Sequence, residues 1–226
     1  LNTIVDKTQG IESVTNAEAT TGGDEIEDDE SLRERAFVKT RFPGTSGNKY
    51  HYMHWALDVN GVGRAKVFSL WNGPGTVKVS ILNREHKKAD KELMDEVKEY
   101  IDPLEYQQKG QELAPIGALL TVSTATEKTV DISLNLAVLD DYEVEDTLKA
   151  IKVEVDNYFR DISYKVDDEN FRKYIDIASY NMIINIIWNI EGVKHFNDLT
   201  LNGKKENVEI GDEEILVVGN VEHKEL

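Results

Sequence analysis

The sequence predicts an α+β fold made of two small domains, each with helices packed on a mostly antiparallel sheet. Segments that alternate apolar and polar residues, typical of half-buried strands, are interleaved with segments whose apolar residues recur at helical spacing. Two successive units of the chain each combine helices with strands, in the orders ααββαβ and βααβββ. We therefore expect the end of a preceding, mostly missing domain and a linker at 1–23, a central domain at 24–125 and a C-terminal domain at 126–226.

The central domain is expected to begin with two helices. Before them, residues 10–15 predict only a weak strand. Ser31-Leu32-Arg33-Glu34 is a capping box, in which hydroxyl and carboxylate each satisfy an unpaired amide, so we expect a helix over 28–40. Phe42-Pro43-Gly44 ends it. A second helix fits 46–58, with an apolar face at helical spacing.

A hairpin, a helix and a further strand complete the central domain. Strands are expected over 65–71 and 76–82, joined through Pro74-Gly75, which has the residues that a type II turn favours at its centre. Apolar spacing predicts a helix over 93–101, and a strand is expected over 117–124.

The C-terminal domain is expected to begin with the clearest strand of the chain, residues 130–138. Asp140 or Glu143 can cap the helix that follows. Strands over 193–201 and 207–210 flank Asn202-Gly203, a hairpin signal, and a last strand covers 215–221. The apolar stripes of the two predicted helices are Val144, Leu148, Ile151, Val155 and Tyr158, then Phe171, Ile175, Ala178, Met182, Ile183, Ile186 and Ile187.

Composition restricts the classes of function. The 226 residues include 26 Lys and Arg against 43 Asp and Glu, a formal net charge of −17, so we expect no nucleic acid partner. No apolar run approaches the roughly 20 residues of a membrane span, and no signal segment follows Leu1, so neither membrane insertion nor secretion is expected. The absence of cysteine excludes disulfides and thiolate chemistry. The acidic run 24–30 is interpreted as a solvated linker or helix start rather than a cation site.

Three groups of residues have spacings that can serve a ligand. His51 and His54 stand one helical turn apart with Asp58 beyond them, but no third ligand completes a metal site, and we interpret both as surface or partly buried histidines. Gly61-Val62-Gly63-Arg64 lacks the third glycine and the following helix of a dinucleotide loop. Asn72-Gly73-Pro74-Gly75 has no following lysine and is interpreted as a hairpin tip.

Paired carboxylates are the remaining candidates for chemistry. Asp140-Asp141 and Asp167-Asp168-Glu169 lie in polar connections near helix starts, where carboxylates commonly cap helices. Exposed carboxylates there are poor general acids at neutral pH. No Gly-x-Ser-x-Gly motif is present. We therefore predict no catalytic residue, no metal and no cofactor, and a protein that is not an enzyme.

One long motif carries a family resemblance. Its residues are Thr45, Ser46, Gly47, Asn48, His51, Tyr52, Trp55, Gly61, Val62 and Gly63, followed by the continuous stretch 70–77. Together with Pro115-Ile116-Gly117-Ala118 and Glu191-Gly192-Val193 downstream, this motif resembles the baseplate J-like proteins of Mu-like and related phages. Residues 13–16, 22–25 and 32–35 resemble the exit of that family from its N-terminal barrel-like domain.

The resemblance implies a structural component of a contractile tail baseplate, in a phage, a prophage or a phage-tail-like particle. It implies a wedge protein that contacts other wedge proteins and copies of itself, assembles in the bacterial cytoplasm into a multimeric tail, and helps transmit the contraction signal. Trp71, Asn72, Gly73, Pro74 and Gly75 are the candidate shaped contact loop. The longer Gln-rich connection at 104–114 and the acidic exit loop depart from the family pattern.

Two other functions remain as alternatives to a structural role. A metal-dependent hydrolase would use His51, His54 and acidic side chains, since tails often carry enzymes that degrade the cell wall. A carbohydrate-active, tail-associated binding module would use exposed aromatic residues among acidic loops. Stoichiometric metal in the purified protein favours the first alternative, and glycan binding favours the second.

Overall fold

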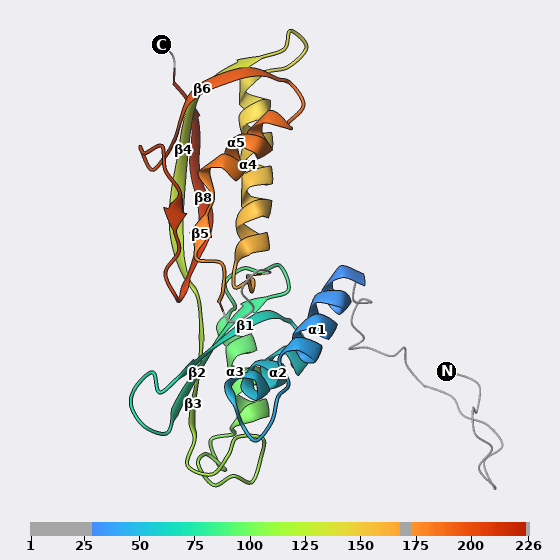
Figure 1. Ribbon diagram of the computed structural model, residues 1–226, viewed down its shortest axis with the longest axis vertical. Coiled ribbons are helices and arrows are strands. Elements are labelled where there is room, and N and C mark those ends of the chain that lie inside the picture. Colours follow the sequence, from blue (N-terminus) through green and yellow to red (C-terminus); the bar gives the residue numbers. More distant parts are fainter. Residues whose placement is uncertain (1–28, 168–172, 225–226) are drawn as a thin grey trace, which may run out of the picture. The chain divides into compact units, whose positions relative to one another are not determined.

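The computed structural model describes residues 29–167 and 173–224 (Figure 1), and it confirms the predicted α+β class. The helices are α1 (Asp29–Arg41), α2 (Lys49–Asp58), α3 (Lys91–Ile101), α4 (Val144–Ile162) and α5 (Tyr180–Trp188). The strands are β1 (Val62–Ser69), β2 (Thr76–Asn83), β3 (Leu119–Thr124), β4 (Thr126–Val138), β5 (Ile177–Ala178), β6 (Val193–Leu201), β7 (Val208–Glu209) and β8 (Glu214–His223).

Helix α1 spans the boundary between two units of the chain. Residues up to Phe37 belong to one unit, and residues from Val38 onward form a second compact unit. The helix has Lys39 and Arg41 in its last turn, where positive charge favours a helix C-terminus. Its predicted first residue, Asp28, and the predicted strand at 10–15 lie outside the described residues.

The first sheet has the strand order β1-β2-β3, with β1 antiparallel and β3 parallel to β2. Its strands and helix α3 follow the predicted order ααββαβ. Helices α2 and α3 pack on one face of the sheet, where Val79, Ile81 and Leu120 are buried with Val97 of α3. Alternation along β2 turns Val79 and Ile81 toward the helices, because successive side chains of a strand point to opposite faces.

Helix α2 begins three residues later than predicted. Ser46 and Gly47 have left-handed backbone angles, φ 49° and φ 70°, which a helix cannot include. Asn48 then caps the helix, because its side-chain oxygen accepts a hydrogen bond from the His51 backbone N–H at 2.8 Å. Helix α3 starts in the same way, with Asp90 accepting from the Leu93 N–H at 2.9 Å.

The long connection between α3 and β3 is organised by a buried carboxylate. Asp102 is 2% exposed, and one of its oxygens accepts from Lys98 Nζ at 2.7 Å and from the Leu120 N–H at 3.2 Å. Gln107 Nε2 donates to the same oxygen at 3.2 Å. A buried carboxylate with several donors fixes the chain around it, so the connection is anchored at both ends.

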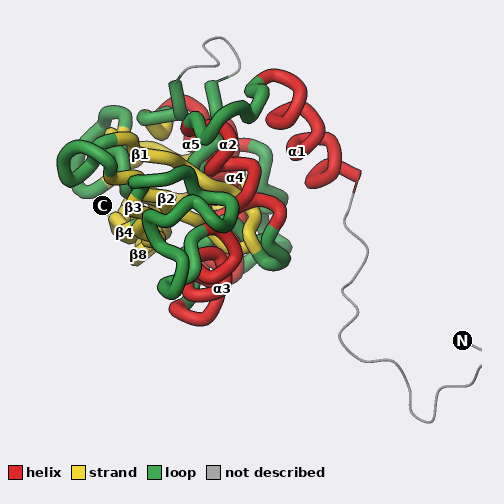
Figure 2. The backbone as a smooth tube through the Cα atoms, turned by 90° about the horizontal axis from the view of Figure 1, so that it is seen from below, coloured by secondary structure: helices red, strands yellow, loops and turns green. Residues whose placement is uncertain are grey.

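The second sheet has the strand order β6-β4-β8, and β4 is antiparallel to β6 but parallel to β8. Its buried face, with Val130, Ile132 and Leu134, packs against α4 and α5. These two helices lie side by side in both views (Figures 1 and 2). Figure 1 also shows that β3 leads directly into β4, with only the buried Ala125 between the two strands.

The helix predicted from the apolar residues at 171–187 is shorter than expected. Ile177 and Ala178 form strand β5, which pairs with β7, and α5 begins only after Ser179, whose side chain caps it. A serine before the helix start competes with continuation of a helix from the preceding residues. Met182 of the predicted stripe is 46% exposed, whereas Ile183 and Ile187 are fully buried. Phe171 lies outside the described residues.

The hairpin predicted around Asn202-Gly203 is wrong, although the turn itself is present. Asn202 and Gly203 have φ angles of 49° and 79°, as a type I′ turn requires, and Leu201 pairs with Lys204. Strand β7 then pairs with β5 rather than with β6. The turn is tied to β4, because the Asn202 side-chain oxygen accepts from the Asp131 N–H at 2.8 Å.

Candidate functional site

The predicted contact loop at 71–75 joins β1 to β2 as a closed hairpin tip. The Leu70 N–H donates to the Thr76 carbonyl at 2.8 Å. The Thr76 hydroxyl donates to the Gly73 carbonyl at 2.7 Å and accepts from the Asn72 N–H at 3.0 Å. These bonds close the loop on both sides of its tip, so its backbone is held from within.

The turn at Pro74-Gly75 has the geometry that the sequence predicts. Gly75 has φ 78°, and the Thr76 N–H donates to the Gly73 carbonyl at 3.3 Å, as in a type II turn. A Cβ at Gly75 would also stand only 3.1 Å from the Gly117 carbonyl oxygen. Only glycine combines this backbone angle with this close approach.

Trp71 is the large side chain that this loop presents. It is 42% exposed, and its neighbour Leu70 is 65% exposed at φ 58°. The Lys78 ammonium lies 4.5 Å from the centre of the Trp71 ring, a cation–π contact that covers one face of the indole. The loop therefore offers an exposed aromatic edge on a fixed backbone, which is suited to contact with another surface.

The earlier part of the family motif builds the core rather than a surface. Tyr52 is 1% exposed, Trp55 is 9% exposed, and their rings meet edge to face. His51 stacks on Trp55 with ring centres 4.0 Å apart, and its Nδ1 accepts from the Gly47 N–H at 3.2 Å. Burial raises the pKa of Tyr52 to about 12, with the Asp102 charge adding to the effect.

Two glycines of the motif permit close contacts between segments. A Cβ at Gly47 would stand 2.3 Å from Cγ of Pro115. The absence of a side chain at Gly47 therefore allows the turn before α2 to pack against Pro115. A Cβ at Gly63 would stand 2.4 Å from the Asn83 carbonyl across the sheet. Gly61 precedes β1, and Val62 is a buried core residue. The Gly61–Gly63 turn thus serves strand packing.

The remaining motif residues lie in the turn that leads into α2. Thr45 and Ser46 are exposed, and Asn48 caps the helix. Asn48 Nδ2 also donates to the Pro43 carbonyl at 3.2 Å, so the same side chain holds both ends of this turn. Their role in this structure is to position α2.

His51 and His54 both face Gly44, where a Cβ would stand 3.0 Å from an atom of each ring. Burial lowers the pKa of His54, against a hydrogen bond with the Val38 backbone and the Asp58 charge, which raise it. Within residues 29–167 and 173–224, no group of three His, Asp or Glu side chains is placed to hold a metal ion.

Of the candidate carboxylate groups, only Asp140-Asp141 is described in full. Asp140 and Asp141 are exposed in the turn before α4. Glu143 precedes that helix as its N-cap residue without a side-chain cap bond, so the predicted capping by Glu143 is wrong. Asp167 is described, whereas Asp168 and Glu169 lie outside the described residues.

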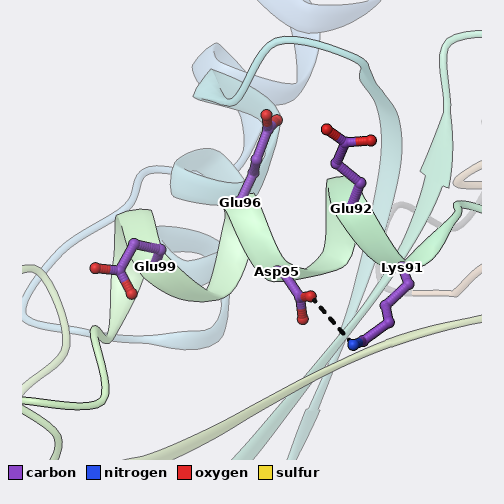
Figure 3. A pocket seen from close by; sticks show the side chains of 5 residues that line it. All are labelled: Lys91, Glu92, Asp95, Glu96 and Glu99. Atoms are coloured by element: carbon purple, nitrogen blue, oxygen red, sulfur yellow. Dashed lines mark ion pairs between the residues drawn. The ribbon is translucent and has the colours of Figure 1, made fainter.

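Helix α3 carries an acidic surface that the sequence did not single out (Figure 3). A shallow hollow is lined by Lys91, Glu92, Asp95, Glu96 and Glu99. Glu92 and Glu96 point to one side of the helix, and Asp95 turns to the other, where it pairs with Lys91 at 3.8 Å. All five side chains are exposed, so the hollow is a solvated helix face without a buried group directed into it.

The exposure of two apolar side chains and one contact of a lysine were not predicted. Leu104 and Ile116, on the connection between α3 and β3, are 80% and 82% exposed. Lys78 lies on β2, and its ammonium contacts the Trp71 ring. No described helix is both long enough and apolar enough to cross a membrane.

Comparison with known proteins gives the family directly. A model of the baseplate J-like central domain matches residues 44–124, and a model of the baseplate J-like protein C-terminal domain matches residues 130–223. The phage-like element PBSX protein XkdT of Bacillus subtilis strain 168 is 37% identical over 217 residues, which cover 96% of this chain and 59% of that protein. The chain therefore spans 59% of the length of this relative.

A more distant relative and a solved structure are also similar to this chain. Baseplate protein gp47 of Escherichia phage Mu is 34% identical over 116 residues, 49% of this chain and 31% of that protein. A chain in the six-fold symmetrised cryo-EM structure of the anti-feeding prophage baseplate shares the fold, with a TM-score of 0.55 and 9% identity over 88% of this chain and 43% of that one. The resemblance noted in the sequence is confirmed, and the chain belongs to the baseplate J-like protein family.

Proposed function

We propose that this chain is a structural part of the baseplate of a contractile phage tail or of a related tail-like particle, where it acts in wedge assembly and in transmission of the contraction signal. The observation that carries the proposal is the adjacent match of the two baseplate J-like domain models over residues 44–124 and 130–223. The relatives named as baseplate proteins, and the baseplate chain that shares the fold, support the same role.

The organisation of the chain follows from this proposal. We propose a central domain at 24–125 and a C-terminal domain at 126–226; residues 1–23, where the end of a barrel-like N-terminal domain and a linker are expected, lie outside the described residues. The two hydrophobic clusters support the second boundary, because the buried residues of one fall within 42–120 and those of the other within 130–216. Val166 is the partly buried residue of the first cluster that lies beyond the boundary.

The proposed partners are other wedge proteins and neighbouring copies of this chain, in a multimer within the virion tail that assembles in the bacterial cytoplasm. Exposed apolar side chains support a role in contact, because interfaces are enriched in large aromatic and apolar residues. Leu70 and Trp71 on the β1–β2 loop, with Leu104 and Ile116 on the α3–β3 connection, supply such side chains. We propose the 71–75 loop as one contact surface.

We further propose that the protein performs no catalysis. What supports this is the use of the motif residues: the described ones build turns, helix caps and core. The metal-dependent alternative lacks a specific observation in its favour, since Nδ1 of His51 is engaged by the Gly47 N–H.

The proposal is tested by deleting the gene in a bacterium that produces the particle and restoring it on a plasmid. Electron microscopy of lysates is expected to find no assembled sheathed tails after deletion, and normal tails after restoration. Intact, contraction-competent tails from the deletion strain would contradict the structural role.

The contact loop is tested in the same strain. Restoration with Trp71→Ser is expected to give fewer assembled tails than restoration with Trp188→Ser, which alters a tryptophan of similar exposure, 48% against 42%. Equal tail yields from the two variants would remove the loop from the set of contacts while leaving the baseplate role intact.

A further inference from the structure

The face of the first sheet that points away from α2 and α3 carries an unusual set of buried cations. Arg64 and Lys66 of β1 are 6% and 9% exposed, and Lys78 of β2 has a side chain that is 12% exposed. The register places Lys66 opposite Ser80 and Phe68 opposite Lys78 on this face. Burying a charged group is costly unless it is paired, so the partners of these cations matter.

Arg64 is held by the end of helix α4. Its Nη1 donates to the backbone carbonyls of Asp161 at 2.6 Å and Ser163 at 2.7 Å, with a longer bond to Arg160 at 3.3 Å. The last carbonyls of a helix have no partner within the helix and carry partial negative charge. A side chain of the central domain thus caps the main helix of the C-terminal domain.

The two lysines are held by the turn that precedes β8. Lys66 Nζ lies 3.1 Å from an Asp212 carboxylate oxygen, and Lys78 pairs with Glu213. Both ammonium groups also lie near the Phe68 ring, 5.5 Å from its centre for Lys66 and 5.2 Å for Lys78. Adjacent carboxylates therefore match adjacent cations across the boundary between the domains.

Neutral contacts complete the junction. The Ser80 hydroxyl and the Tyr164 hydroxyl share a buried hydrogen bond of 2.8 Å. Leu82, Ala125, Tyr164 and Ile215 form a small separate apolar cluster beside it. The Lys66 ammonium also lies 4.8 Å from the centre of the Tyr174 ring, so an aromatic side chain of the C-terminal domain contacts it as well.

We propose that this set of contacts is a lock that holds the C-terminal domain in one orientation on the central domain, and that Lys78 links the exposed Trp71 ring to the lock. Between the matched domains 44–124 and 130–223, Ala125 separates strands β3 and β4, so the side-chain contacts, which lie far from Ala125 in the sequence, add restraints to this single chain connection. Attachment at the end of α4, at Asp212 and at Glu213 constrains rotation as well as separation.

The link to Trp71 follows from the position of one ammonium group. Lys78 Nζ is shared between the Glu213 carboxylate and the Trp71 ring, whose centre is 4.5 Å away. A contact that moves this ring changes the surroundings of Lys78 and hence its pairing with Glu213. An event at the loop surface is thereby transmitted to the orientation of the C-terminal domain.

The lock is tested on the purified chain, which has no cysteine of its own, by placing spin labels at Glu99→Cys on α3 and Glu154→Cys on α4. In the parent, pulsed electron paramagnetic resonance is expected to give a single narrow distribution of distances between the two labels. Arg64→Met is expected to widen the distribution about twofold or more, as loss of a hinge restraint does. Arg84→Met, which alters a bond to Asn60 within the central domain, is the matched control and is expected to leave the width unchanged.

If Arg64→Met does not fold, Arg64→Lys serves, because lysine keeps the charge but lacks the planar fork that reaches several carbonyls. A broad distribution in the parent, or an unchanged width in the Arg64 variant, overturns the lock. For the link, Trp71→Ala is expected to widen the distribution and Trp188→Ala to leave it as in the parent. Equal widths in these two variants overturn the role of Trp71 and leave the Arg64 result to decide the lock.

Discussion

Strands β2 and β4 carry nearly the same alternation, yet their polar sides meet different surroundings. In β2, Val77, Val79 and Ile81 alternate with Lys78 and Ser80; β4 repeats this pattern from Val130 to Leu134 with Asp131 and Ser133. The polar side of β4 is exposed at Thr129, Asp131 and Ala137, although Ser133 is 7% exposed. The polar side of β2 is covered, because Ser80 is fully buried and Lys78 pairs with Glu213.

The difference teaches that alternation identifies the apolar face of a strand and leaves the other face undetermined. A lysine in a strand keeps its charge near water in one protein and supports a junction in another, depending on what the rest of the chain places there. Here the covering groups are Tyr164, Tyr174, Asp212 and Glu213, which lie far along the sequence from β2.

The largest expected effect is a difference in unfolding free energy between a variant on the covered face of the first sheet, at Arg64 of β1, and a variant on the polar side of β4. Arg64→Met removes the donors of three carbonyls at the end of α4, and we expect a loss of about 2–4 kcal/mol of unfolding free energy. Asp131→Asn, on the open side of β4, is expected to have a much smaller effect. Urea denaturation followed by circular dichroism measures both. Similar losses for the two variants would abolish the distinction between the faces.

A smaller effect is expected at the two lysines. Lys66→Met or Lys78→Met is expected to cost about 1 kcal/mol, because each charge pair has one partner that is open to solvent and screened by it. Raising the salt concentration should reduce the cost. Lys204→Met, which breaks an exposed pair with Glu206, is the control and should leave the denaturation midpoint unchanged. A cost that is the same at low and high salt would show that packing, rather than charge, dominates.

The predictable part of this fold is the part that depends on local pattern. The central order of helices and strands, strand β6 and the type II turn at Pro74-Gly75 were all predicted, because apolar spacing and turn residues act over a few positions. The pairing of β7 with β5 was not, since Asn202-Gly203 specifies a turn but not the path of the chain beyond it. The lock could not be predicted either, because its carboxylates lie more than 130 residues from Lys78 and Lys66.

A third prediction uses pH to probe the covered side. Burial raises the pKa of Tyr164 from its ordinary 10 to about 12, against the hydrogen bond with Ser80, which lowers it. The folded state therefore favours the neutral phenol, and its stabilising effect is complete below pH 10 and lost as pH rises toward 12. Tyr164 accounts for a loss of about 1 kcal/mol by pH 11.

This prediction is checked by urea denaturation between pH 8 and pH 11. Tyr164→Phe should lose less stability over this interval than the parent, whereas Tyr142→Phe, at a tyrosine that is 39% exposed, should follow the parent. Because burial also raises the pKa of Tyr52 and Tyr174, some alkaline loss should remain in Tyr164→Phe. A pH dependence identical to that of the parent would contradict the assignment.

The smallest effect is expected on the other face of the same sheet, at His54 of α2. Burial lowers the pKa of His54 below its ordinary 6.5, with Lys39 and His51 acting in the same direction and the Val38 backbone and Asp58 opposing them. The contribution to stability is present above pH 6.5 and is lost as pH falls through the lower pKa of the folded state. His54→Gln should therefore lose less stability than the parent between pH 7 and pH 5, while His195→Gln, at an exposed position, should match the parent. Because His54 lies outside the lock, the distribution of distances between the spin labels at positions 99 and 154 should keep its width between pH 7 and pH 5. A broader distribution at pH 5 would show that the acid-sensitive group lies at the junction between the domains.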